Sequence, residues 1–215
     1  MTPRSLREVR QDAYRDLILE AAEPVFADHG YEAARVQEIA AATGASVGTI
    51  YGVFGSKAEL FGTVLTHRLP RLLEVAHAGS AGATCALERI LDGLDATLRF
   101  VLAHPAWLRI HLGDHAWGLG PVRADRDQLA AWRQGVGLAA QLLGEAMDDG
   151  HVVRADPLLL ARMVLAGLQV HLADWVEQGG DEPADTLVPR LRALFLALYG
   201  TPAAPVPLLP RPRSP

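Results

Sequence analysis

Ile39–Lys57, IAAATGASVGTIYGVFGSK, is the stretch that decides the fold. Ala40 is small at the position where two short helices would cross, and Gly44 can adopt the positive φ that a tight turn between helices demands. Ile50 is the apolar residue that would fix the second helix in a core. The spacing of these three residues therefore predicts a helix, a tight turn and a second helix.

Ser46 stands where the N-cap of the second helix belongs. We therefore predict helices over Val36–Thr43 and Val47–Phe54. A helix that follows such a turn is the element that helix-turn-helix proteins place in the major groove of DNA. The sequence thus predicts a DNA-reading unit near its N-terminus.

Residues 15–61 form one longer pattern around this unit. Its positions are Ile18–Ala22, Val25–Phe26, Gly30–Tyr31, Thr49–Tyr51, Phe54, Ser56–Lys57 and Leu60. The stretch resembles the N-terminal domain of TetR-family repressors. The resemblance implies an all-α protein with a three-helix helix-turn-helix DNA-binding head and a larger C-terminal helical domain that binds a ligand and dimerises.

The resemblance also implies contacts with DNA. Lys57, the only lysine in the chain, falls where the family has a phosphate-contacting lysine. We expect Tyr51 to contact phosphate, Thr49 to contact a base edge or a thymine methyl group, and Gly48 to let the backbone come close. The expected DNA-contacting residues are Arg35, Gln37, Ser46, Val47, Gly48, Thr49, Tyr51 and Lys57.

Three positions depart from the family pattern. Ala34 replaces a helix-capping Thr, Val47 stands where a basic or polar residue is common, and Val53 stands where His or Tyr often follows. The second helix also lacks Arg, Asn and Gln, the side chains that read bases through two hydrogen bonds. We therefore expect a modest affinity, or one that leans on the N-terminal arm.

The head is not a basic domain. Residues 1–60 hold six Arg or Lys against nine Asp or Glu, a net charge of −3. Residues 1–15 are net positive, with four Arg against Glu8 and Asp12. This arm would lie along phosphates or in a minor groove, or else it is a frayed terminus.

Hydrophobic periodicity predicts about nine helices and no strand. The expected helices are Gln11–His29, Val36–Thr43, Val47–Phe54, Lys57–Ala78, Thr84–Ala103, Pro105 to near Trp117, a helix opened by Gly118–Pro121 and ending at Asp149, Asp156 to Gly179, and Pro183–Tyr199. We divide the chain into a DNA-binding domain (1–56), an effector and dimerisation domain (57–200) and a Pro-rich disordered tail (201–215).

Composition narrows the class of protein. Half of the 215 residues are apolar, and Cys85 alone cannot form an internal disulfide, so we expect a cytoplasmic protein. The longest apolar stretch, Leu158–Val170, is interrupted by Arg162 and Gln169, which argues against a membrane span. There is no Gly-rich phosphate loop and no Gly-x-Ser-x-Gly motif. We expect neither an enzyme nor a bound cofactor.

The last two predicted helices indicate assembly. The one from Leu158 to Val176 is apolar on nearly every side, which fits a helix buried both by its own domain and by a partner. We predict a homodimer through a four-helix interface; a single-chain core is the alternative. The expected interface residues are Leu165, Leu172, Leu187, Leu191, Leu194, Phe195 and Leu198.

The larger domain holds all four Trp residues. The resemblance implies a small, largely apolar effector, and aromatic, Met and His side chains on the predicted helices would surround one cavity. Each of them can equally be ordinary core. The expected ligand-binding residues are Phe100, Trp107, His111, Trp132, Met147, Met163, His171 and Trp175.

His104, His111, Asp114 and His115 form a second candidate site. His111 and His115 are four residues apart and share a helix face, a spacing at which two imidazoles can hold one divalent metal. This favours an alternative function, a metal-responsive regulator or a metal-dependent enzyme. Surface histidines without a metal are the simpler interpretation.

These patterns together predict a ligand-responsive transcription regulator. One short helix reads too little sequence to be selective, so two heads related by a two-fold axis would bind a palindromic operator of double-stranded DNA. We expect a repressor that its effector releases from that operator.

Overall fold

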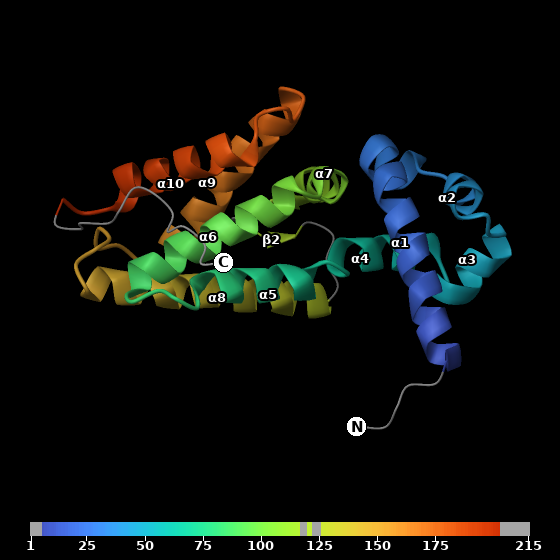
Figure 1. The fold of residues 1–215 in the computed structure, drawn as a ribbon, viewed down its shortest axis with the longest axis horizontal. Coiled ribbons are helices and arrows are strands. Elements are labelled where there is room, and N and C mark those ends of the chain that lie inside the picture. Colours follow the sequence, from blue (N-terminus) through green and yellow to red (C-terminus); the bar gives the residue numbers. More distant parts are fainter. Residues whose placement is uncertain (1–5, 117–119, 122–125, 203–215) are drawn as a thin grey trace. The chain divides into compact units, whose positions relative to one another are not determined.

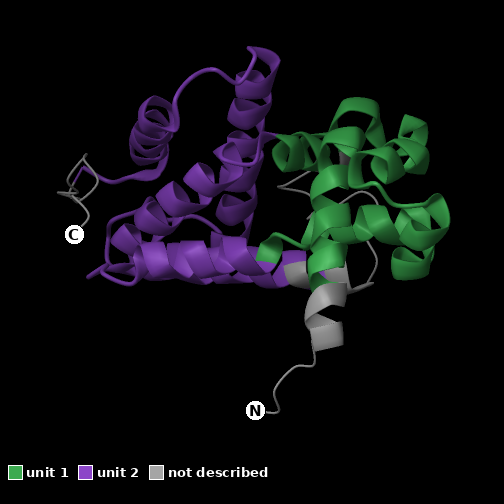
Figure 2. Cartoon of the chain, turned by 45° about the vertical axis from the view of Figure 1, so that its right-hand side comes forward, with its two compact units in different colours: residues 1–69, 106–113 green, residues 70–105, 114–215 purple. Residues whose placement is uncertain are grey.

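The computed structural model describes residues 6–116, 120–121 and 126–202 (Figure 1). The described residues form ten α-helices and one pair of two-residue strands. The expected all-α fold is confirmed. The chain divides into two compact units, residues 1–69 with 106–113 and residues 70–105 with 114–215 (Figure 2).

The first unit contains the N-terminal helices and one later helix. Its helices are α1 (Leu6–Ala33), α2 (Val36–Thr43), α3 (Val47–Phe54), α4 (Lys57–Thr66) and α7 (Pro105–Asp114). Helix α1 packs against α2 and α4, and its assigned range runs across a kink at Gly30, where φ is 68°. The apolar core cluster of the unit includes Ile18, Phe26, Ile39, Ile50, Phe54, Leu60, Val64 and Ile110.

The helix expected over Lys57–Ala78 is two helices, so that prediction is wrong. Helix α4 ends at Thr66, and α5 runs from Leu69 to Ser80. Pro70 explains the break, because proline has no N–H to donate and its ring clashes with the carbonyl four residues earlier. In a continuous helix, the Pro70 ring would clash with the carbonyl of Thr66, four residues earlier.

The second unit is built around α6 and α8. Helix α6 (Ala86–Leu102) packs against both α8 (Arg126–Asp148) and α10 (Ala184–Tyr199), and α8 also packs against α9 (Pro157–Glu177) (Figure 1). Strands β1 (His115–Ala116) and β2 (Gly120–Pro121) pair antiparallel. The core cluster includes Leu87, Leu91, Val136, Leu143, Ala146, Met147, Val152, Leu160 and Phe195.

Two of the expected helix boundaries depend on local signals, and both are confirmed. The side chain of Asp156 accepts a hydrogen bond from the backbone N–H of Leu159 at 2.7 Å, which caps the start of α9. Gly150 follows the end of α8 with φ 74°, a conformation that favours glycine. The β1–β2 pair was not expected, because two residues are too few to establish an alternating pattern.

A buried charge cluster joins α6 to α10 in the second unit. Arg192 is 3% exposed, and its Nη1 lies 3.0 Å from Asp92 and 3.6 Å from Asp95. Burial raises the pKa of Asp95, and the neighbouring charge of Asp92 adds to this, while Arg192 and Arg99 offset it only in part. The buried Arg192 therefore pairs with one buried carboxylate, Asp95, and with one partly exposed carboxylate, Asp92.

Candidate functional site

The turn between α2 and α3 has the geometry that the sequence predicts. Gly44 adopts φ 69° and ψ 12°, and the N–H of Ala45 reaches back to the carbonyl of Ala40 at 3.0 Å. Ser46 caps α3 by accepting a hydrogen bond from the backbone N–H of Thr49 at 3.0 Å. Both caps are local, and together they fix where α3 begins.

Helix α3 presents one face to the core and the other to solvent. Ile50 and Phe54 have no exposed surface, whereas Thr49 is exposed and Tyr51 is 40% exposed. The expected orientation of α3 is therefore observed. The Thr49 hydroxyl lies 2.8 Å from that of Ser46, so the two exposed side chains share a hydrogen bond at the start of the helix.

Two glycines lie on this outer face. A side chain at Gly52 would meet nothing within 4 Å, and one at Gly48 would meet only the hydroxyl of Ser46, at 3.6 Å. Packing within the chain does not require glycine at either position, although glycine costs a helix about 1 kcal/mol relative to alanine. Glycine at both positions would allow a partner molecule to approach the helix backbone closely.

Lys57 begins α4 beside this face. Its Nζ donates a hydrogen bond to the carbonyl of Glu32 at 3.1 Å and lies 4.9 Å from the centre of the Tyr31 ring. Ser56 caps the same helix end through the N–H of Glu59 at 3.1 Å. The lysine thus ties α4 to the end of α1 and keeps its charge at the surface. Arg35 and Gln37, at the start of α2, are also exposed.

A buried ion cluster holds the other end of α4 to α1. Arg68 contacts both carboxylate oxygens of Glu23, through Nε at 2.6 Å and Nη2 at 3.1 Å, and Nε2 of His67 lies 2.7 Å from Oε1. Burial by itself would raise the pKa of Glu23, but the contacts with His67 and Arg68 hold it below its ordinary value. Glu23 is therefore a satisfied, charged carboxylate.

The family model of bacterial regulatory proteins of the tetR family matches residues 18–64, which cover α2, α3 and most of α1 and α4. Residues 18–64 of this chain are similar to the TetR-family DNA-binding domain. Among its relatives, the transcriptional repressor AcnR of Corynebacterium glutamicum is 44% identical over 61 residues, 28% of this chain and 32% of that protein.

Two further likenesses extend beyond the TetR-family head. YhgD of Bacillus subtilis, an uncharacterized transcriptional regulator, is 26% identical over 76% of this chain and 85% of its own length. The ketosteroid transcriptional regulator KstR2 of Mycobacterium tuberculosis has the same fold, with a TM-score of 0.71 at 23% identity over 87% of this chain and 95% of that chain.

The match with the AcnR proteins covers only part of them. The chain spans 32% of the length of AcnR from C. glutamicum and 47% of that from Corynebacterium efficiens. The two alignments cover 28% and 46% of this chain.

The expected ligand-binding residues fall in both units. Trp107 and His111 belong to the first unit, where the Trp107 indole is buried and donates to the carbonyl of Val64 at 3.1 Å. In the second unit, Met147 is buried in the core cluster, and Trp132 is partly buried against that cluster. Met163 is half exposed. Phe100 and His171 are partly buried, and Trp175 is buried and donates to the carbonyl of Glu182.

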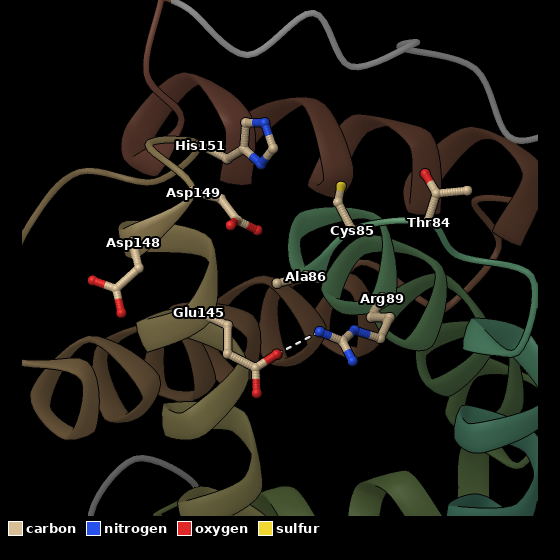
Figure 3. A pocket seen from close by; sticks show the side chains of 8 residues that line it. All are labelled: Thr84, Cys85, Ala86, Arg89, Glu145, Asp148, Asp149 and His151. Atoms are coloured by element: carbon tan, nitrogen blue, oxygen red, sulfur yellow. Dashed lines mark hydrogen bonds and ion pairs between the residues drawn. The ribbon is translucent and has the colours of Figure 1, made fainter.

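The second unit has a polar pocket of about 680 Å³ that none of these residues lines. Figure 3 shows the pocket between the start of α6 and the end of α8, with the ion pair of Arg89 and Glu145 across it. Cys85, Asp149 and His151 also line it. Its lining is polar and charged, unlike the site expected for an apolar effector.

The histidines of the predicted metal site are bound to their own backbone. Nδ1 of His104 lies 2.7 Å from the carbonyl of Phe100, and Nδ1 of His111 lies 3.0 Å from that of Trp107. The side chains of Asp114 and His115 lie outside the described residues. Among those that are described, no three His, Cys, Asp or Glu residues are arranged to hold a metal.

Most of the expected interface residues are buried within the single chain. Leu172 and Leu187 have no exposed surface, Leu191 is 3% exposed and Phe195 is 5% exposed, because they face the core of their own unit. Leu165 and Leu194 are partly buried. Leu198 is 58% exposed. In this conformation Leu172, Leu187, Leu191 and Phe195 have no surface to offer a partner.

Other apolar residues of α9 are exposed. They are Leu158, Leu159, Met163 and Val170. Within the described residues, α9 is also the one helix whose length and composition would allow it to cross a membrane, a test that core helices of soluble proteins pass as well. In the part of the single chain that the structure describes, nothing covers these apolar side chains, and exposed apolar patches of this kind are typical of interaction surfaces.

The contacts of Arg15, Glu23 and Arg192 within the fold were not predicted from the sequence. Each of these residues lies four residues from a buried apolar residue on its own helix, and so on the buried face. Arg15 precedes Leu19, Glu23 follows the same residue, and Arg192 follows Val188. A charged residue at helical spacing within an apolar stripe is the pattern that could have indicated these buried contacts.

Proposed function

We propose that this chain is a cytoplasmic, non-catalytic transcription regulator, a repressor that binds a palindromic operator as a homodimer and leaves it when a small, largely apolar effector binds. The observation that carries the proposal is the orientation of α3. Thr49 and Tyr51 face solvent while Ile50 and Phe54 anchor the helix, in a segment that matches the TetR-family head. A short exposed helix after a tight turn is suited to the major groove.

The exposed apolar face of α9 supports the dimer. Leu159, Met163 and Val170 follow one another at helical spacing and are each at least half exposed. We assign the two-fold interface to this face, with Leu198 of α10 as a further contact. The buried leucines expected from the sequence then support the interface from within the chain.

The effector proposal draws on the second unit. Met147 belongs to the core cluster against which Trp132 packs, and Phe100 and His171 are partly buried in the same unit. Aromatic and Met side chains suit a largely apolar ligand. For such a ligand to act as an inducer, it must bind the two arrangements of the paired heads with different affinity.

Selection of DNA fragments by the purified protein, with and without lipophilic compounds, tests the proposal. We expect enriched palindromes whose half-sites lie about 34–36 Å apart or a multiple of that, and release by a matching compound. Thr49→Ala should change the preferred sequence. Lys57→Ala should weaken binding to every sequence and lower the slope of log affinity against log salt by about 0.9.

Arg71→Ala provides the matched control. Arg71 is an exposed basic residue of α5, paired with Glu74 and outside the head. This variant should bind DNA as the unaltered protein does. Enrichment of no sequence, or of single half-sites without symmetry, would contradict the proposed mode of binding.

A further inference from the structure

Helix α3 is too short to be stable by itself. It has eight residues, and isolated helices of fewer than about 12 residues are marginal in water. Its orientation therefore depends on what holds its two ends. Ser46 holds the first end, as described above, and the last turn leaves carbonyl groups without partners inside the helix.

Arg15 of α1 reaches this last turn. Its Nη1 donates a hydrogen bond to the carbonyl of Val53 at 3.4 Å. A positive charge at the C-terminal end of a helix also interacts favourably with the helix dipole. The contact joins residues that are 38 positions apart in the sequence, so it fixes α3 to α1 and does not merely extend the helix.

The same guanidinium lies over the ring of Phe54. Its central carbon is 4.4 Å from the ring centre, within the range of a cation–π interaction. Phe54 has no exposed surface, so the ring provides a fixed platform. Arg15 is itself partly buried. Two groups of the last turn, a carbonyl and an aromatic ring, thus share one cation.

We infer that Arg15 is a positioning residue, which holds the C-terminal turn of α3 in the orientation that reads DNA, and is not one of the arginines that contact phosphate. The expected effect of Arg15 on DNA binding rests on the proposed function. From the sequence, Arg15 belongs to the net-positive stretch 1–15, in which each arginine is a candidate for a phosphate contact. The two roles predict different behaviour.

Specific and non-specific DNA distinguish the two roles. Non-specific binding depends on phosphate charge, whereas specific binding also needs α3 to be aligned with the base edges. Loss of a positioning residue should weaken specific binding alone. Loss of a phosphate contact should weaken both and lower the slope of log affinity against log salt by about 0.9.

The experiment compares Arg15→Met, Arg15→Lys and Arg109→Met on the selected operator and on a scrambled duplex over a range of salt. Arg109 is a matched control, an exposed arginine of the same unit that pairs with Asp28 at 3.0 Å. We expect Arg15→Met to weaken operator binding about tenfold, with no change on the scrambled duplex or in the salt slope.

Arg15→Lys should recover most of the operator affinity, because an ammonium group can still lie over the ring and donate one hydrogen bond. Arg109→Met should bind both duplexes as the unaltered protein does. The inference is overturned if Arg15→Met leaves the ratio of the two affinities unchanged. Equal weakening on both duplexes, with a shallower salt slope, would instead indicate a phosphate contact.

Amide hydrogen exchange without DNA separates this inference from the proposed function. In Arg15→Met the amides of the last turn of α3 should exchange about tenfold faster, while those of α2 keep the rate of the unaltered protein. The exchange measurement does not require DNA binding. If the protein bound no DNA, the proposed function would be wrong, but faster exchange in this turn would still support the positioning role. Equal rates in the last turn would overturn the positioning role.

Discussion

Glu23 in the first unit and Asp95 in the second are both buried carboxylates that face an arginine. Arg68 grips Glu23 through two hydrogen bonds, and His67 adds a third contact, so the pKa of Glu23 is lowered. Asp95 is 3.6 Å from Arg192, which lies closer to Asp92, and burial keeps the pKa of Asp95 raised.

The difference lies in how completely each carboxylate is surrounded by donors. Among the described residues, Oδ1 of Asp95 and Nε of Arg192 are buried and lack hydrogen-bond partners, whereas both oxygens of Glu23 are engaged. A buried charge is costly unless it is paired and hydrogen-bonded. Proximity of an arginine is therefore not enough; its geometry decides whether the carboxylate favours its charged form.

Removal of the arginine from the second unit should have the largest effect. Arg192→Met removes the cation that contacts both Asp92 and Asp95, and we expect a loss of about 3 kcal/mol of unfolding free energy at neutral pH. Urea unfolding at a fixed protein concentration measures it. Arg190→Met is the control, since its exposed ion pair with Glu182 should contribute less than about 1 kcal/mol. Equal losses in the two variants would show that the cluster has no special role.

Glu23→Gln should have an intermediate effect that depends on pH. The amide keeps the shape but removes the charge that Arg68 and His67 surround, so we expect a loss of about 2 kcal/mol at pH 7. Because the folded pKa of Glu23 is lowered, its contribution is complete above the pKa of the unfolded chain and is lost as pH falls through the folded pKa. The difference from the unaltered protein should shrink toward pH 3.

Glu20→Gln, one turn earlier on α1 and exposed, is the control for this measurement. Its unfolding free energy should stay within about 0.5 kcal/mol of the unaltered protein at every pH. A loss in Glu23→Gln that is the same at pH 3 and pH 7 would mean that shape, not charge, accounts for the effect of Glu23.

Asp95→Asn should have the smallest effect and the opposite sign. A raised folded pKa means that the contribution of Asp95 is present below the pKa of the unfolded chain and is lost as pH rises through the folded pKa. We therefore expect the variant to gain about 1 kcal/mol at pH 7 and nothing at pH 3. Unfolding of Asp174→Asn, an exposed site on α9, is the comparison. A loss of stability at pH 7 would reverse the contrast between the units.

Local signals in the sequence predict the head closely. The bounds of α2 and α3 agree with the structure residue for residue, because Gly44 and Ser46 fix them through neighbours in the chain. The outward direction of Thr49 follows from the same periodicity. Whether the expected residues contact DNA, and where the domains divide, stay predictions.

Contacts between residues far apart in the chain could not be predicted from the sequence. The partners in the two charge clusters are 45 and 100 residues apart, and no local pattern selects them. Trp107 follows α6, a helix of the second unit, so the sequence favours a place in the larger domain for it. In the structure it is part of the first unit, because the helix that carries it packs there. Only tertiary contacts decide such assignments.

The carbonyl of Val64 has a consequence for attempts to isolate the head. It accepts from the His67 ring, at 2.8 Å, and from the indole of Trp107, at 3.1 Å, while Ile110 of α7 completes the apolar cluster beside it. The first unit is therefore discontinuous along the chain. A fragment cut after residue 69 would lose the indole donor and expose apolar side chains, so residues 1–69 alone do not contain the complete first unit.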